Sequence, residues 1–274
     1  MFEIVADIKL NPSLGNHAQA LALAARTYNV PAHIVMPSIS TPSKISGTKT
    51  LGANVHFSGS TDPEREAKVA DVMKEHPGLI FVPPYDHPDI ILGQGTMALE
   101  LEKQVEEQYE QKLDAVIAAL GGGGMLSGIA TALQGTDIKV FGAEPKFQGA
   151  NDGQIGLSQG KRIEHVSTLT LADGLRTPVG KIAWTVISDK EKVKGVFSVT
   201  ESQIKAAMKL VLERMKLVVE PSGCVPLAVV LFDEEFRKLV ERESGQKGWN
   251  LGVIFGGGNT TVEAIAELFA TPDS

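Results

Sequence analysis

The sequence predicts an α/β protein whose strands form parallel sheets covered by helices. Short apolar segments of strand length alternate with longer amphipathic segments along most of the chain. Strands that alternate with helices run parallel to one another, and strands buried on both faces are apolar throughout. A run of four glycines directly follows one apolar segment, which places a loop of bare backbone between a strand and a helix.

The first third of the chain contains three helix–strand pairs. The expected helices cover residues 15–30, 42–52 and 62–77, and the expected strands cover residues 32–37, 54–59 and 79–84. A glycine closes the second helix and acidic residues open the third, as is usual at helix ends. This order predicts a parallel sheet with helices on both faces.

The rest of the chain continues the alternation and forms a second unit. The expected helices cover residues 96–113, 126–133, 201–217, 225–236 and 261–270, and the expected strands cover residues 114–120, 137–145 and 250–255. Residues 146–180 are rich in Gly, Asn, Asp and Pro, and we expect them to be irregular. The prolines of PPYDHPD, residues 83–89, predict a hinge. We therefore expect a smaller α/β domain over residues 10–86 and a larger one over 87–274.

Composition excludes several classes of protein. The 274 residues are 43% hydrophobic and 22% charged, and the net charge of −7 argues against a nucleic-acid partner. No run of 18 apolar residues is present, so we expect neither a membrane span nor a membrane partner. The first residues do not resemble a secretory signal, and the single cysteine, Cys224, fits a reducing compartment. We expect a cytoplasmic protein.

The segment GGGGMLSGIA, residues 121–130, predicts an anion site. It lies where open α/β sheets bind ligands, and the following helix offers free N–H groups at its start. Glycines let these amides approach a phosphate closely, and Ser127 could add a hydroxyl. A Walker A loop is excluded, because Ile129 and Ala130 stand where that motif requires a lysine and a Ser or Thr.

Three interpretations of the glycine loop remain. A dinucleotide fingerprint of Rossmann type would use Gly122 and Gly124, but Ser127 stands in place of its third glycine. Glu144, 20 residues after Gly124, could then bind a ribose hydroxyl. The second interpretation is the phosphate of a smaller cofactor. The third is a tight strand–helix turn without a ligand, although a turn alone rarely needs four glycines.

Eight short motifs occur in one order over nearly the whole chain. They are GNH (15–17), GQGTMALE (93–100), GGGGM (121–125), AEP (143–145), ADG (172–174), ERMK (213–216), EPSG (220–223) and GGGN (256–259). In this order they resemble the pyridoxal-phosphate enzymes of the serine racemase and threonine dehydratase type. The resemblance implies the two-domain architecture of fold type II, with pyridoxal 5′-phosphate in the cleft and the larger domain as the cofactor-binding domain.

The resemblance also implies which residues contact the cofactor. Gly121 to Met125 match the loop that binds the phosphate, Asn16 matches the asparagine beside the pyridine 3-oxygen, and Glu220 matches a glutamate close to the ring. The full set of cofactor-binding residues is Asn16, Gly121, Gly122, Gly123, Gly124, Met125, Gly174, Glu220 and Gly256. Asn16 could instead only cap its helix, and His17 is expected to be structural rather than a base.

A structural cation site of the family is only partly present. Glu144 matches a carboxylate ligand of Mg²⁺ or Ca²⁺, but the second acidic ligand of the family falls on Ala150. Asn151 or Asp152 could substitute after a small shift.

Three positions depart from the family pattern. In the family, a lysine upstream of Gly-Asn-His forms the Schiff base with the cofactor and serves as a base at the substrate α-carbon. Only fourteen residues precede Gly15, and the context of their one lysine, Lys9, does not match. The second base of the racemases, a serine, is replaced by Leu14, and Gly256 replaces the residue that bonds the pyridine nitrogen. We expect an N-terminally truncated form that keeps no catalytic residue of the family.

By resemblance we expect a serine/threonine dehydratase- or racemase-like protein that acts on a small amino acid and forms a homodimer. Leucine cannot move a proton, so α,β-elimination is expected rather than racemisation. One alternative is a catalytically impaired short relative, or one with altered chemistry in the same cleft, because the lysine of the family is missing from its usual place. A second alternative is a nucleotide-binding protein of Rossmann type.

Overall fold

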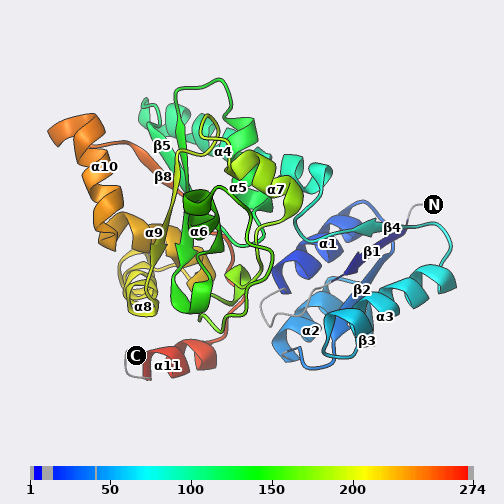
Figure 1. The fold of residues 1–274 in the computed structure, drawn as a ribbon. Helices are drawn as coiled ribbons and strands as arrows, with labels where there is room; N and C mark the ends of the chain where they lie inside the picture. Colours follow the sequence, from blue (N-terminus) through cyan, green and yellow to red (C-terminus); the bar gives the residue numbers. More distant parts are fainter. Residues whose placement is uncertain (1–2, 8–14, 41, 271–274) are drawn as a thin grey trace. The chain divides into compact units, whose positions relative to one another are not determined.

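The computed structural model describes residues 3–7, 15–40 and 42–270 of the chain. The chain divides into two compact units, Met1–Pro84 and Tyr85–Ser274, here called unit 1 and unit 2. Each unit contains one four-stranded sheet in which every described strand pair is parallel (Figure 1). No helix among the described residues is both long and apolar enough to cross a membrane.

Unit 1 is a parallel sheet with the strand order β3-β2-β1-β4. Its elements are β1 (Glu3–Asp7), α1 (Gly15–Thr27), β2 (Ala32–Pro37), α2 (Pro42–Thr50), β3 (Asn54–Ser58), α3 (Asp62–Glu75) and β4 (Leu79–Val82). The central strand β2 is buried on both faces: Ile34 lies in the cluster formed with α1, and Val35 lies in the cluster formed with α3. The helices therefore cover both faces of the sheet, as the continuous apolar run of β2 predicts.

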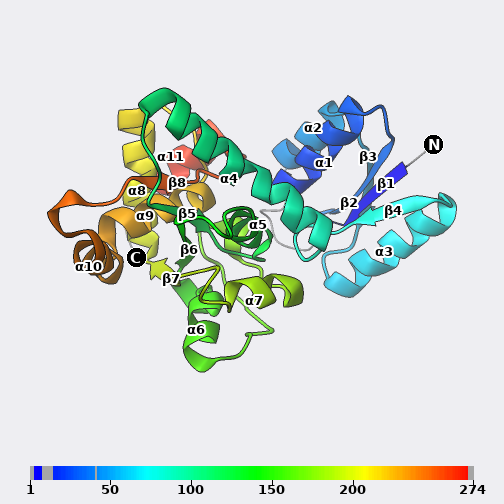
Figure 2. The ribbon, with the colours of Figure 1, turned by 90° about the horizontal axis from the view of Figure 1, so that it is seen from above.

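Unit 2 is a parallel sheet with the strand order β7-β6-β5-β8 (Figures 1 and 2). Its strands are β5 (Ala115–Ala119), β6 (Lys139–Pro145), β7 (Gly195–Val199) and β8 (Leu251–Val253). Its helices are α4 (Pro88–Tyr109), α5 (Gly124–Ala132), α6 (Asp152–Gln159), α7 (Lys181–Ile187), α8 (Glu201–Leu210), α9 (Pro221–Phe232), α10 (Glu234–Ser244) and α11 (Val262–Ala270). Short turns η1 (Phe147–Gly149), η2 (Asp173–Leu175), η3 (Val211–Met215) and η4 (Gly245–Lys247) connect them.

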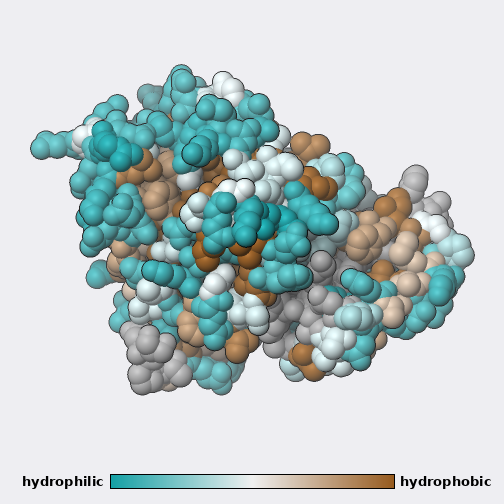
Figure 3. All heavy atoms as spheres, in the orientation of Figure 1, coloured by the Kyte–Doolittle hydropathy of each residue, from teal (hydrophilic) through white to brown (hydrophobic). Residues whose placement is uncertain are grey.

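The two faces of the sheet in unit 2 carry separate cores. Alternate residues of β5 point to opposite faces, so that Ile117 packs with α8, α9 and α10, whereas Val116 packs with α4, α5 and α7. On the face drawn in Figure 3, hydrophilic side chains cover most of unit 2 around α4 and α10. The apolar interior of unit 2 is therefore divided by its sheet, with α5 and α7 on the same side.

The parallel α/β fold predicted from the sequence is present, but several elements differ from the prediction. Residues 146–180, expected to be irregular, contain α6, and the helix expected at 225–236 is two helices because Asp233 caps the start of α10. Helix α4 already begins at Pro88, inside the expected hinge, since proline is well suited to the first turn of a helix. The helix expected at 201–217 is α-helical only as far as Leu210 and continues as a π-turn.

Candidate functional site

The candidate site of unit 2 lies at the point where its strand order reverses. From β5 the chain adds β6 and then β7 on one side, whereas β8 returns to pair with the other side of β5. The loops that follow β5 and β8 therefore leave the sheet in different directions at its carboxyl edge. Open α/β sheets bind ligands at such a switch point, and both glycine-rich loops of unit 2, residues 121–124 and 256–258, are found there.

The glycine loop, residues 121–124, is closed in on one side by Tyr85. A Cβ atom on Gly122 would lie 2.5 Å from the tyrosine ring, and one on Gly124 would lie 2.9 Å from the tyrosine carbonyl oxygen. Real Cβ atoms do not approach other atoms this closely, so both positions require glycine while Tyr85 stays in place. Tyr85, the first residue of unit 2, therefore covers this side of the glycine loop.

On its other side the loop packs against α7 and η2. Gly123 has a φ of +90°, a conformation that favours glycine, and a Cβ there would lie 2.8 Å from the Cβ of Ala183. A Cβ on Gly121 would lie 3.0 Å from the Cα of Leu175 and 3.1 Å from the carbonyl oxygen of Gly174. The four glycines therefore allow a narrow loop to run between several packed segments.

The N–H groups of this loop have no acceptor among the residues that the structure describes. The first hydrogen bond of α5 runs from Ser127 N to Gly123 O at 2.9 Å, and Gly123, the N-cap residue, makes no side-chain bond there. Within the described chain, no backbone bond is donated by residues 122–126. These amides and the helix dipole can bind an anion. The loop thus fits a phosphate group.

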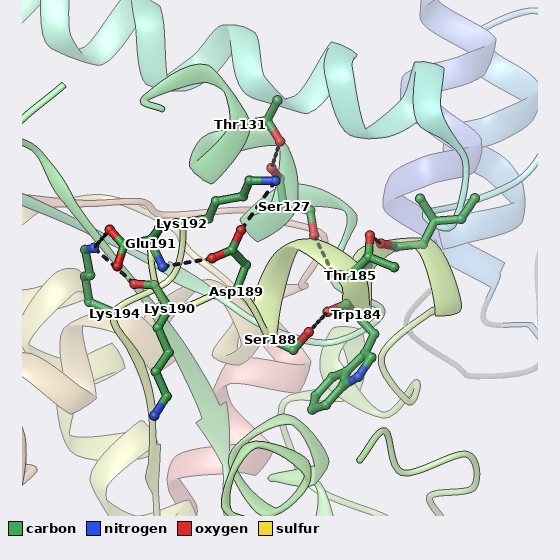
Figure 4. Close-up of polar contacts among 12 residues, drawn as sticks. Ser127, Thr131, Trp184, Thr185, Ser188, Asp189, Lys190, Glu191, Lys192 and Lys194 are labelled. Carbon is green, nitrogen blue, oxygen red and sulfur yellow. Dashed lines mark hydrogen bonds and ion pairs between the residues drawn. The ribbon is translucent and has the colours of Figure 1, made fainter. Parts of the chain in front are cut away.

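The open N–H groups of residues 122–126 are here called the anion cradle. Ser127 does not contribute its hydroxyl to this cradle. Its Oγ donates to the carbonyl oxygen of Ala183 at 3.2 Å, and Thr131 in turn donates to the carbonyl oxygen of Ser127 at 2.8 Å (Figure 4). The expectation of a phosphate contact from Ser127 was wrong, because this position already lies in the first turn of α5 facing α7. The Ser127 hydroxyl therefore links α5 to α7 by a hydrogen bond.

Two other expected residues, Gly174 and Glu220, meet in a second polar cluster. Gly174 N donates to Ser222 Oγ at 2.8 Å, and Asn259 N donates to Glu220 Oε2 at 3.0 Å. Glu220 N also donates to Gly257 O at 3.1 Å, and the Glu220 side chain is only 4% exposed. The motifs ADG, EPSG and GGGN therefore converge. Ser222 and Asn259 belong to this cluster although sequence reasoning did not single them out within their motifs.

Gly256 lies next to Met125. A Cβ on Gly256 would lie 3.6 Å from both Sδ and Cε of Met125, which is an ordinary van der Waals contact, and its backbone does not require glycine. The loop after β8 and the start of α5 therefore lie next to each other at these two residues. Position 256 has room for a small polar side chain, although it carries none in this sequence.

Glu144 is fully buried at the end of β6 and closes the start of α6. Its Oε1 accepts from Gly153 N and its Oε2 from Gln154 N, both at 2.9 Å. Burial, followed by the nearby Asp152 carboxylate, raises the pKa of Glu144 well above its usual value. Both oxygens are already engaged, and the described residues contain no group of three or more His, Cys, Asp or Glu side chains placed to hold a metal ion. The cation site stays a prediction of the resemblance.

Asp152 forms the second buried carboxylate beside Glu144. Its Oδ2 accepts from Val179 N at 2.9 Å, and burial raises its pKa to about 6. The Arg162 guanidinium partly opposes this shift, and Arg162 also donates to Val179 O at 3.0 Å. Asp152 therefore ties α6 to the segment that leads into α7.

The expected residues of the Gly-Asn-His motif belong to unit 1. Asn16 is half-buried in the first turn of α1. Burial lowers the pKa of His17, with a hydrogen bond to the backbone of Val82 acting in the opposite direction, which agrees with a structural histidine. Lys9 and Leu14 lie outside the described residues.

The fold and this cluster of loops define an α/β protein with an open anion cradle at the switch point of a parallel sheet. Solved structures with the same fold show more closely to which class of α/β protein this chain is similar. The structure of maize serine racemase matches with a TM-score of 0.84 at 34% identity, over 97% of this chain and 76% of that one. A threonine deaminase from T.th. matches with a TM-score of 0.77 at 32% identity, over 95% of this chain and 78% of that one.

The chain belongs to the family of pyridoxal-phosphate dependent enzymes, whose model matches residues 8–245. It is 38% identical to an L-threo-3-hydroxyaspartate ammonia-lyase of Pseudomonas sp over 260 residues, 93% of this chain and 75% of that protein. It is 37% identical to a serine racemase of Schizosaccharomyces pombe over 262 residues, 94% of this chain and 75% of that protein. The family resemblance, the fold class and the cofactor expected from the motifs are confirmed, whereas the roles of individual residues stay predictions.

Proposed function

We propose that this chain binds pyridoxal phosphate by its phosphate at the start of α5 and eliminates water from a small hydroxyamino acid, whose enamine product is then hydrolysed to a 2-oxo acid and ammonia. The observation that supports the proposal is the row of backbone amides at residues 122–126, which lack an acceptor in the described chain. These amides lie beside the cluster of Gly174, Glu220 and Ser222, which supplies polar groups near the same loop. A phosphate would satisfy donors that the fold itself leaves open.

The relatives support the substrate class. Their names refer to serine, threonine and threo-3-hydroxyaspartate, which are small amino acids with an oxygen on the β-carbon. Pyridoxal phosphate, when bound, acts as an electron sink that makes the α-proton of an amino acid acidic. Elimination is favoured over racemisation, because Leu14 stands where the racemases have a serine that moves the second proton.

Within unit 2 we assign three roles to described residues. The amides of residues 122–126 bind the phosphate, and Tyr85 with α7 excludes side chains and water from the back of the loop. Glu220 fixes the loop after β8, since it accepts from Asn259 N and donates its own N–H to Gly257 O. The loop after β8 contains Gly256, so the conformation of this loop determines which group lies next to Met125.

A second candidate function is cofactor binding without turnover. It is favoured by position 256, where the family has a hydroxyl or thiol for the pyridine nitrogen and this chain has a glycine beside the apolar Met125. Loss of that hydrogen bond weakens the electron sink, and Leu14 removes one proton carrier. Such a protein would retain the phosphate cradle and give little or no product.

One set of measurements tests both candidates on the purified full chain. Affinity is measured for pyridoxal phosphate, for pyridoxal, which lacks the phosphate, and for NAD. We expect pyridoxal phosphate to bind about 10-fold more tightly than pyridoxal, since only it reaches the loop amides, and to raise the melting temperature, as any ligand of the native state does. Equal affinity for both would contradict the phosphate site, and stabilisation by NAD alone would favour a dinucleotide protein.

Turnover then separates the two candidates. Formation of 2-oxo acid is measured with L-serine, L-threonine and L-threo-3-hydroxyaspartate, and formation of the D-amino acid is measured in parallel. Elimination predicts 2-oxo acid without D-amino acid, whereas binding without turnover predicts neither. Reduction with borohydride followed by peptide mass spectrometry identifies any lysine, Lys9 included, that bonds the cofactor.

We further propose a homodimer in the cytoplasm, as the family resemblance and the composition lead us to expect. Sedimentation velocity of the purified chain tests the first point, with a monomer at all concentrations as the contradicting result. Fractionation of cells that express the chain tests the second.

A further inference from the structure

We propose that Asp86 is a positioning residue that sets the shape of the phosphate-binding glycine loop by holding helix α7 in place. The inference rests on the proposed function of that loop. It concerns a residue that does not touch the cradle itself and whose effect passes through its neighbours.

Asp86 caps the start of α7 with both carboxylate oxygens. Its Oδ2 accepts from Lys181 N at 2.8 Å, and its Oδ1 accepts from Ile182 N at 2.9 Å and from Ala183 N at 3.1 Å. One side chain thus satisfies three of the open amides of a seven-residue helix. The residue lies 95 to 97 positions away in the sequence, so this cap fixes a long-range arrangement rather than a local turn.

Helix α7 packs against one side of the glycine loop. Gly180 N donates to Gly122 O at 3.0 Å, just before the helix begins. The Cβ of Ala183 and the Cδ1 of Ile187 lie 2.8 and 2.9 Å from the place where a Cβ of Gly123 would be. The carbonyl oxygen of Ala183 also accepts a hydrogen bond from the Ser127 hydroxyl of α5. A shift of α7 would therefore change the direction of the loop amides.

The residue before Asp86 covers the opposite side of the same loop. Tyr85 lies against Gly122 with its ring and against Gly124 with its carbonyl group. The dipeptide Tyr85–Asp86 therefore contacts one side of the loop directly and holds the helix on the other side. These are the first two residues after the end of unit 1 at Pro84.

The far end of α7 is held less firmly. Ser188 Oγ donates to Trp184 O at 2.7 Å, and the turn beyond carries the ion pair between Lys192 and Asp189 at 3.7 Å (Figure 4). Both side chains of this pair are partly exposed, and such surface pairs contribute little to stability. The cap at the start of α7 is therefore the stronger constraint on its position.

The test compares affinities of the purified full chain for pyridoxal phosphate and pyridoxal, before and after substitution. Asp86→Ala removes all three acceptor contacts. Asp86→Asn keeps one carbonyl oxygen for Ile182 and Ala183 but cannot accept from Lys181. Asp233→Ala is the matched control, because Asp233 caps α10 by accepting from Phe236 N at 2.8 Å on the other face of the sheet.

We expect the preference for pyridoxal phosphate over pyridoxal to fall about 10-fold in Asp86→Ala and less in Asp86→Asn, because the loop amides lose their alignment. The affinity for pyridoxal itself should change less than twofold in both. Asp233→Ala should lower the melting temperature while leaving the preference as in the wild type. This pattern distinguishes positioning of the phosphate loop from a general loss of stability, which would weaken both ligands together.

An unchanged preference in the Asp86 variants overturns the inference, as does an equal weakening of both ligands. If Asp86→Ala does not fold, Asp86→Asn decides by the same criterion. A wild-type chain that shows no preference for pyridoxal phosphate overturns the proposed function as well, so the two failures are distinguishable.

Discussion

The starts of α5 and α6 follow neighbouring strands of one sheet, yet their amides are satisfied in opposite ways. At α6 the buried carboxylate of Glu144 accepts from Gly153 and Gln154. At α5 the N-cap is Gly123, which offers no side chain. A helix start closed by a carboxylate of the chain is complete without a ligand, whereas an open one at a switch point is available to an exogenous anion. The difference identifies the ligand site better than the count of glycines does.

The largest expected effect is on the closed start of α6. Glu144→Ala should lower the free energy of unfolding by about 4 kcal/mol, because it leaves two buried N–H donors without an acceptor. Urea denaturation measures the loss. Glu144→Gln keeps one acceptor oxygen and should lose about half as much. An alanine variant as stable as the wild type would mean that water or an anion accepts from the two N–H groups in place of the carboxylate.

The pH dependence of stability tests the partner of Glu144. The folded-state pKa of Asp152 is raised to about 6, whereas its pKa in the unfolded chain is about 4. The contribution of Asp152 to the free energy of unfolding is therefore fully present below about pH 4 and is lost as the pH rises through the folded-state pKa. The shift of the pKa corresponds to about 3 kcal/mol. The wild type should therefore lose more stability than Asp152→Asn between about pH 4 and pH 7. Parallel stability profiles for the two proteins would contradict the assignment.

The open start of α5 is tested by a pair of glycine variants. Gly123 and Gly135 have φ values of +90° and +87°, but only Gly123 has neighbours that a Cβ would meet. Gly123→Ala should cost about 2 kcal/mol and reduce the preference for pyridoxal phosphate, whereas Gly135→Ala should cost about 1 kcal/mol from backbone strain alone. Chemical denaturation and ligand titration measure both. A retained preference in Gly123→Ala would show that the phosphate is bound elsewhere.

The smallest expected effect is at position 256. Gly256→Ser fits beside Met125 and adds a hydroxyl near the place where the family pattern has a partner for the pyridine nitrogen. We expect a few-fold tighter binding of pyridoxal phosphate and pyridoxal alike, because the hydroxyl acts on the ring rather than on the phosphate. Titration with both ligands is the measurement. A change for pyridoxal phosphate alone would place this residue at the phosphate instead.

The sequence predicted those parts of unit 2 that depend on local pattern. The apolar runs indicated β5 and β6, and the glycines after β5 indicated the turn into α5, because strand periodicity and glycine conformation are local properties. Helix α7 was not predicted, since its cap is Asp86, which lies far away in the chain. Helix α6 was missed for the same reason: the carboxylate that closes its start belongs to β6.

The site residues show the same division. The motifs around Gly174 and Glu220 were found from their order in the chain, and the structure brings both into one cluster. The hydroxyl of Ser127 was misassigned, because its direction depends on α7 packing against α5. The sequence therefore located the backbone of the cradle but not the side chains that support it.

The tight packing around residues 121–124 has an evolutionary consequence. Each of these glycines is kept small by a packed neighbour within unit 2, so purifying selection for folding alone would preserve all four. Positions such as 256, where a side chain meets only ordinary contacts, are free to drift. A lineage that abandoned the ancestral reaction would thus lose its reactive side chains long before its glycine loop, and the loop records descent more durably than it records activity.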